Sequence, residues 1–124
     1  MLESAEMVAF LATADGERCR AFYEGVLGLE FVSGDDFALV FRSGGMTLRI
    51  SRVESPTVAP YTVLGWRVPD VRDAVTELRA RGVVFEVFAG MGQDELGIWT
   101  PPGGGTIAWF KDPDGHLLSV GGMG

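Results

Sequence analysis

The hydrophobic pattern of this chain consists of short apolar runs and two amphipathic stretches. The first run, residues 8–13, predicts a strand. After Asp15, a residue type common at helix N-caps, apolar side chains recur three and four residues apart. This spacing predicts a helix that ends at Gly28. Three further apolar runs predict strands at residues 29–32, 37–42 and 46–53.

The same order of elements begins again after a polar, proline-containing stretch at residues 54–60, which we interpret as a linker. A strand is expected at residues 62–68, and Asp70 is expected to cap a helix that closes at Gly82. The strands expected after it are residues 83–88, 106–111 and 116–120. The last two flank the sequence Asp-Pro-Asp-Gly at residues 112–115, which is typical of a tight turn.

The chain therefore contains an internal repeat of two βαβββ modules, at about residues 6–53 and 61–121. A module of this size is too small to bury one face of its sheet alone. We expect an α+β fold in a single domain, residues 1–124. Its two modules should pair into a curved mixed sheet around a concave cup, with the helices on the convex side.

The second module carries an insertion at residues 89–105 that is rich in glycine. Connections of this length in compact domains are often functional or mobile, although a plain surface connection is the alternative. Trp99 in this loop favours a functional role, because an exposed indole is costly unless it covers something.

Composition narrows the classes of partner. The 124 residues carry a formal net charge of -7, which argues against nucleic acid and anionic membrane surfaces as partners. No run of 18 apolar residues is present, so the expected location is the cytoplasm. The single cysteine, Cys19, excludes an internal disulfide and falls on the apolar stripe of the first helix, where a core role is expected.

Three segments carry a resemblance to a known family: residues 19–31, 68–85 and 107–120, the last reading IAWFKDPDGHLLSV. In their order and turn sequence they resemble the vicinal oxygen chelate superfamily, which includes glyoxalases, bleomycin-resistance proteins, extradiol dioxygenases and fosfomycin-resistance enzymes. The resemblance covers about residues 6–121 and implies the fold described above. It specifies function weakly, because this fold supports several chemistries.

Enzymes of that superfamily hold one divalent metal ion through His, Glu or Gln side chains on the first and last strands of each module. Spacing from Asp15, Asp70 and Gly115 transfers these positions to Val8, Arg49, Leu64 and Ser119. A divalent ion requires anionic or imidazole donors, and these four side chains are apolar, cationic or hydroxylic. We therefore expect no metal and no other cofactor.

Strand alternation then predicts an apolar, aromatic cup with one cation. The expected ligand contacts in the cup are Phe10, Thr47, Arg49, Leu64, Trp66, Trp99 and Ser119. Such a lining suits a small organic molecule with an acceptor group for the guanidinium. Two alternatives remain open: Phe10 and Trp66 could be core residues, and Arg49 could pair with Glu3, Glu6 or a dimer mate.

No catalytic set is apparent. His116, the only histidine, is expected to be exposed beside its turn, and Asp94 and Glu95 are expected to be solvated. The leading hypothesis is a metal-independent small-molecule-binding protein similar to the bleomycin-resistance branch, for which the resemblance implies a homodimer. The alternatives are a glyoxalase-like metal-dependent lyase, isomerase or dioxygenase, and an interaction protein whose cup is filled by its own side chains.

Overall fold

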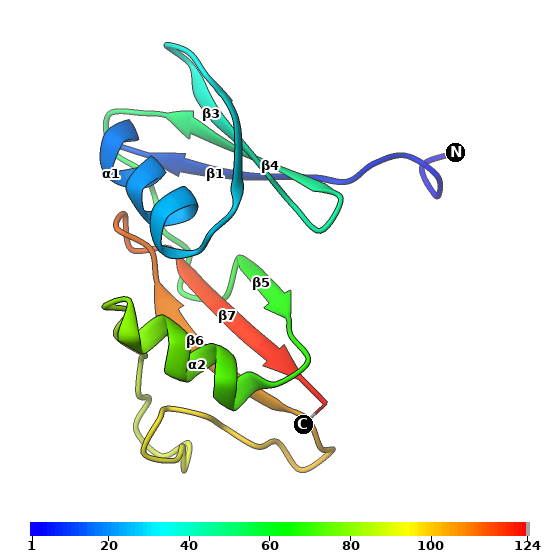
Figure 1. Cartoon of the computed structure of the whole chain (residues 1–124), viewed down its shortest axis with the longest axis vertical. Coiled ribbons are helices and arrows are strands. Elements are labelled where there is room, and N and C mark those ends of the chain that lie inside the picture. The colour runs from blue at the N-terminus through cyan, green and yellow to red at the C-terminus, as the bar shows by residue number, and fades with distance from the viewer. Residues whose placement is uncertain (124) are drawn as a thin grey trace. The chain divides into compact units, whose positions relative to one another are not determined.

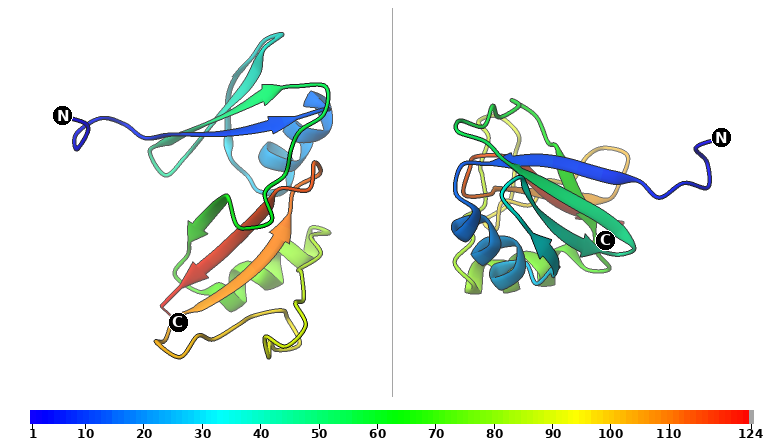
Figure 2. Two further views of the ribbon diagram at one scale, coloured as in Figure 1. Left: turned by 180° about the vertical axis from the view of Figure 1, so that it is seen from behind. Right: turned by 90° about the horizontal axis from the view of Figure 1, so that it is seen from above.

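The computed structural model describes residues 1–123 and divides the chain into two compact units, Met1–Thr57 and Val58–Gly124. Each unit is described by itself. The boundary between the units lies in the expected linker, and residues 53–63 form neither a helix nor a strand. In each unit a helical segment lies against one face of a sheet (Figure 1, Figure 2).

The first unit contains a four-stranded mixed sheet in the order β1-β4-β3-β2. β1 runs parallel to β4, and the other neighbours are antiparallel. Its elements are β1 (Val8–Thr13), α1 (Gly16–Arg20), a π-helical segment η1 (Ala21–Val26), β2 (Glu30–Gly34), β3 (Ala38–Ser43) and β4 (Met46–Arg52).

The second unit repeats this arrangement with three strands in the order β5-β7-β6. β5 runs parallel to β7, as β1 does to β4, and β6 and β7 form an antiparallel hairpin. Its elements are β5 (Leu64–Arg67), α2 (Val71–Ala80), β6 (Thr106–Lys111) and β7 (Leu117–Gly122). The α+β class is confirmed, and the second unit repeats the order of elements of the first except for the strand expected at residues 83–88.

Both helices begin where the capping residues predict. Asp15 Oδ1 accepts a hydrogen bond from the Arg18 N–H at 3.1 Å, and Asp70 Oδ1 accepts one from the Asp73 N–H at 3.0 Å. Each carboxylate satisfies an N–H that the first turn leaves without a partner inside the helix. Gly82 follows the second helix with φ of 94°, a conformation that favours glycine.

One face of each sheet packs against its helix and forms the core of that unit. In the first unit, Phe41 on β3 is fully buried against Tyr23 of η1, with ring centroids 5.6 Å apart. In the second, Phe110 on β6 and Val75 on α2 are fully buried, and the Trp66 ring stacks on Phe110 at 6.5 Å and 17°. Trp66 is half-buried, and its ring packs on the core residue Phe110.

The prediction of a strand at residues 83–88 is wrong. Only an isolated bridge between Phe85 and Phe110 pairs this segment with β6. The Gln93 side chain takes the place of a strand partner: its Oε1 accepts from the Phe88 N–H at 2.7 Å, and its Nε2 donates to the Glu86 and Gly97 carbonyls at 2.9 and 2.8 Å. Local side-chain bonds of this kind compete with the ladder bonds of a sheet.

Candidate functional site

The face of each sheet turned away from the helix, here called the helix-free face, carries most of the predicted ligand contacts. In the first unit Val8 pairs with Thr47 and Phe10 with Arg49, so these four side chains share this face, as expected. The Phe10 side chain is 66% exposed. Within residues 1–123, Arg49 forms no hydrogen bond or ion pair, and Glu6, one of the partners considered for it, contacts Thr47, with 3.4 Å between Thr47 Oγ1 and Glu6 Oε1.

In the second unit the register corrects the sequence-based assignment. Gly65 pairs with Ser119, whereas Leu64 pairs with Leu118 and Trp66 with Val120. Leu64 and Trp66 therefore lie on the helix-covered face and do not share a face with Ser119. The assignment placed β5 one residue out of register, and a slip of one residue moves every side chain of a strand to the opposite face.

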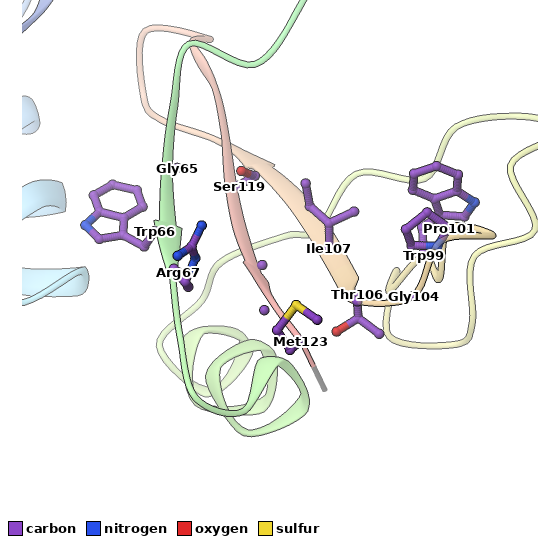
Figure 3. Close-up of a pocket in the computed structure, with 13 residues that line it drawn as sticks. Gly65, Trp66, Arg67, Trp99, Pro101, Gly104, Thr106, Ile107, Ser119 and Met123 are labelled. Carbon is purple, nitrogen blue, oxygen red and sulfur yellow. The ribbon is translucent and has the colours of Figure 1, made fainter.

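A hollow with a volume of about 610 Å³ lies on the helix-free face of the second unit (Figure 3). Two of the predicted residues, Trp99 and Ser119, line it. Trp66 also borders the hollow, but its ring lies on the far side of β5 in Figure 3. Arg67 and Ile107 were not predicted as lining residues from the sequence. Both follow from strand alternation once the register is known: Arg67 and Ile107 pair with Gly121, which lies two residues after Ser119 on β7 and so on the same face.

Glycine forms the floor of this hollow. Gly65 and Gly121 lie on the helix-free face of neighbouring strands, beside Ser119 and Ile107. A Cβ atom at Gly65 would lie 2.6 Å from Ser119 Oγ, and one at Gly121 would lie 3.3 Å from the Thr106 carbonyl oxygen. Glycine inside a strand often marks a place where another group approaches the backbone closely. The floor is therefore formed by the backbone at Gly65 and Gly121 together with the Ser119 hydroxyl, which takes the space that a Gly65 Cβ would need.

Trp99 forms one wall and is held by backbone and ring contacts. Its N–H donates to the Ile107 carbonyl at 2.8 Å, and its carbonyl accepts from the Ile107 N–H at 3.0 Å. Its ring lies 6.0 Å from that of Trp109, whose Nε1 donates to Thr62 Oγ1 at 3.1 Å. Trp99 is half-buried, so one part of the ring is packed and another remains available to a ligand.

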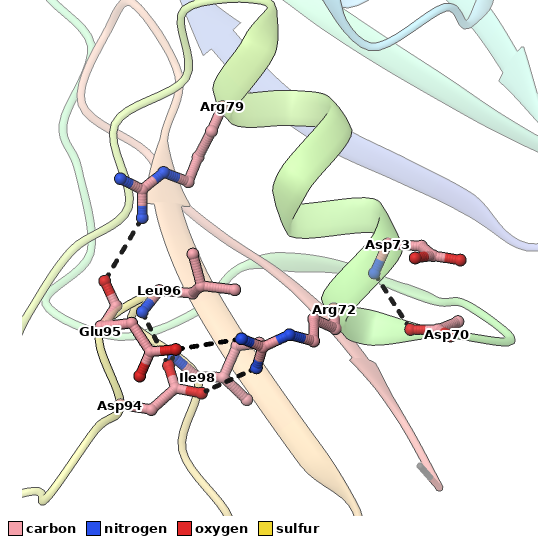
Figure 4. Close-up of polar contacts among 8 residues, drawn as sticks. All are labelled: Asp70, Arg72, Asp73, Arg79, Asp94, Glu95, Leu96 and Ile98. Carbon is pink, nitrogen blue, oxygen red and sulfur yellow. Dashed lines mark hydrogen bonds and ion pairs between the residues drawn. The ribbon is translucent and has the colours of Figure 1, made fainter.

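The loop that carries Trp99 is tied to α2 (Figure 4). Asp94 Oδ1 accepts from the N–H groups of Leu96 and Ile98, both at 2.9 Å, and Arg72 pairs with Glu95 at 3.0 Å and with Asp94 at 3.7 Å. A backbone hydrogen bond, followed by the bond from Arg72, lowers the pKa of Glu95. Asp94 and Glu95 are both exposed, as expected, and their hydrogen bonds and ion pairs also hold the loop to α2.

The two remaining reactive residues lie outside the hollow. His116 is buried, at 4% exposure, contrary to expectation. Its backbone N–H donates to Asp112 Oδ1 at 2.9 Å, so the turn at residues 112–115 folds over the start of β7. Cys19 is a buried residue in the core of the first unit, as predicted.

The family is decided by the sequence profile. The profile of the Glyoxalase/Bleomycin resistance protein/Dioxygenase superfamily matches residues 6–120. The chain belongs to this superfamily. No curated protein sequence matches the chain significantly. No helical segment within residues 1–123 has the length and apolar composition needed to cross a membrane.

Solved structures agree with membership of the superfamily. A lactoylglutathione lyase from Agrobacterium tumefaciens is 22% identical, with a TM-score of 0.73 over 96% of this chain and 93% of that one. A glyoxalase family protein from Bacillus anthracis is 16% identical, with a TM-score of 0.76 over 98% and 96%. A glyoxalase/bleomycin resistance protein/dioxygenase from Nocardioides is 18% identical, with a TM-score of 0.73 over 98% and 84%. At these identities the similarity shows the fold.

The metal that superfamily enzymes hold does not fit the side chains of this chain. When the two hairpins are aligned by their strand pairing, Thr47 corresponds to Leu117 and Arg49 to Ser119. Val8 lies beside Thr47 in the first unit, and Val63 lies beside Leu117 in the second. The counterpart of Val8 is therefore Val63 and not Leu64. The corrected positions carry two valines, an arginine and a serine, which together offer no carboxylate or imidazole. Among residues 1–123, no three His, Cys, Asp or Glu side chains are grouped so that they could hold a metal ion.

Proposed function

We propose that this member of the superfamily binds a small organic molecule, without a metal ion, in the hollow on the helix-free face of the second unit. The observation that carries the proposal is the composition of that hollow. It combines a glycine floor, an aromatic wall at Trp99, a hydroxyl at Ser119 and one cation at Arg67. Sites for small molecules are typically concave and mostly apolar, with a few polar groups that orient the ligand.

Metal independence is supported by donor chemistry. Hard divalent ions take carboxylate or carbonyl oxygens, and zinc takes thiolate, imidazole or carboxylate. The corrected superfamily positions supply one hydroxyl among four side chains, and Arg49 would repel a cation.

Elemental analysis tests metal independence. The chain is expressed in medium supplemented with nickel, zinc, manganese and iron, desalted, and analysed by mass spectrometry of the elements. We expect far less than one ion per chain. Retention of about one ion of any of these metals per chain would contradict the proposal and favour a lyase, isomerase or dioxygenase of the glyoxalase type.

Ligand binding is tested separately by native mass spectrometry of the freshly purified protein and by an amide-correlation NMR spectrum before and after organic extraction. We expect a co-purified organic molecule whose removal shifts the indole N–H resonance of Trp99. A ligand-free protein whose Trp99 resonance responds to no compound in a chemically diverse library would contradict the proposal.

Phe10, Thr47 and Arg49, on the helix-free face of the first unit, stay predicted ligand contacts. Replacing Arg49 with Leu tests them, since an effect on the affinity of an anionic ligand is expected only if the guanidinium takes part in binding. The homodimer implied by the family also stays a prediction, and the same native mass spectra measure it.

A further inference from the structure

We infer that the ligand of the hollow is a planar aromatic anion, with its acidic group at Arg67 and its ring on the glycine floor against Trp99. The inference rests on the proposed function, because it names the chemical class of the molecule that the same hollow takes. It follows from the charge of the lining, the shape of the floor and the position of the aromatic wall.

The charge of the hollow is opposite to that of the whole chain. The chain has a formal net charge of -7, yet among residues 1–123 Arg67 is the one charged side chain that lines the hollow, and no Asp or Glu side chain of this part lines it. Within residues 1–123 the guanidinium of Arg67 forms no hydrogen bond or ion pair. Its five N–H donors, in a planar fork, are therefore available to a carboxylate or a similar planar acid.

The floor favours a flat molecule. Gly65 and Gly121 add no side chain to this face, and the group that lies over Gly65 is the small Ser119 hydroxyl, so a flat ring can approach the sheet closely. The walls on either side differ in chemistry. In Figure 3, Arg67 extends on the β5 side, while Trp99 lies beyond Ile107 on the opposite side. A ligand that reaches both sides needs a polar end and an aromatic end.

The test uses four probes that separate charge from shape: 2-naphthoate, the neutral 2-naphthylmethanol, the cationic 2-naphthylmethylamine, and cyclohexanecarboxylate, which is an acid without an aromatic ring. Binding is measured on the full chain through the three indole N–H resonances, assigned with single Trp→Phe variants. Trp99 reports the hollow. The backbone amide resonance of Phe41, which is fully buried in the first unit, serves as the internal control.

We expect 2-naphthoate to shift the Trp99 indole but not the Phe41 amide, and to bind roughly tenfold more tightly than either the neutral or the cationic probe. Cyclohexanecarboxylate should bind roughly three- to tenfold more weakly than 2-naphthoate, because it cannot stack. Raising the salt concentration should reduce the preference for the anion, since Arg67 is exposed.

Two variants and one control assign the residues. Arg67→Gln should remove the preference for the anion, and Trp99→Leu should weaken both naphthalene probes roughly three- to tenfold. Arg81→Gln makes the same charge change at the end of α2, where Arg81 pairs with Glu77 at 2.8 Å, and should change neither affinity. Amide spectra of each variant establish that it is folded.

Equal affinity for anion, neutral probe and cation, or equal effects of Arg67→Gln and Arg81→Gln, would overturn the inference while leaving binding in the hollow intact. Absence of any Trp99 shift with all four probes would also overturn the inference. Failure of the proposed function is recognised separately, by a Trp99 resonance that no co-purified or library compound moves.

Discussion

The substitution Gly65→Ala tests the register of β5 directly, because the side chain of the neighbouring residue Ser119 leaves little room for a Cβ atom at position 65. An alanine Cβ there would lie 2.6 Å from Ser119 Oγ and 3.4 Å from the Ser119 carbonyl oxygen. The first distance is well inside van der Waals contact, and the second is an ordinary contact. Gly65 has no positive φ, so the backbone itself accepts alanine.

The magnitude follows from opposing effects. Overpacking of a filled site costs about 1–3 kcal/mol, and rotating the hydroxyl away from its favoured rotamer costs about 0.5–1.5 kcal/mol. Replacing glycine by alanine in a strand restores about 0.5–1 kcal/mol. Gly65→Ala should therefore lower the free energy of unfolding by about 0.5–4 kcal/mol. Removing the hydroxyl as well leaves the new Cβ 3.9 Å from the Ser119 Cβ, so the double variant with Ser119→Ala should recover most of the loss.

The assay is urea unfolding of the wild type, both single variants and the double variant, followed by tryptophan fluorescence. All three tryptophans, at positions 66, 99 and 109, belong to the second unit, so the signal reports the unit that contains the substitution. We expect a favourable coupling energy of about 1 kcal/mol between the two sites. Additive effects of the two substitutions, or a Gly65→Ala variant as stable as the wild type, would refute the assignment of Gly65 and Ser119 to one face.

Two further predictions concern carboxylates that accept backbone hydrogen bonds. Asp112 is buried, and its Oδ1 accepts hydrogen bonds from the N–H groups of Asp114 and His116. Asp112→Ala should therefore lower the free energy of unfolding by about 1–3 kcal/mol, and Asp112→Asn by clearly less, because the amide oxygen can still accept. Equal losses for the two variants in urea unfolding would contradict this. Hydrogen bonds from the N–H groups of Ala38 and Phe37 lower the pKa of Asp35, so its stabilisation is present above the ordinary aspartate pKa and is lost as the pH falls through the lowered value. Stability measured from pH 5 to pH 2 should therefore fall less steeply in Asp35→Ala than in the wild type, and an unchanged slope would show that these bonds do not act on the titration.

Local chemistry in the sequence predicted much of the fold. Asp15 and Asp70 are short polar residues placed directly before apolar helical stripes, and each caps its helix as expected. The turn at residues 112–115 was also predictable, because an aspartate at its first position can accept from the N–H groups that follow. These features depend on residues within four positions of one another.

The site was harder to predict because it depends on register between strands distant in the sequence. β5 has four residues, and counting back from Asp70 placed it one residue out of register, which exchanged Leu64 and Trp66 for Gly65 and Arg67. The apolar run at residues 83–88 is a good strand sequence by composition. The bonds from the Gln93 side chain that replace its partners come from a loop with no periodic pattern.

Comparison of the two units explains why the hollow belongs to the second. Arg49 corresponds to Ser119, so the residues paired with them, Phe10 and Gly65, occupy equivalent places in the repeat. One unit presents an exposed aromatic ring at this place, and the other presents bare backbone. A protruding phenyl ring leaves less room for a ligand against the sheet than a glycine beside a serine does, so this one place distinguishes the helix-free faces of the two units. The repeat therefore accounts for the fold of both units, and departure from the repeat accounts for the site.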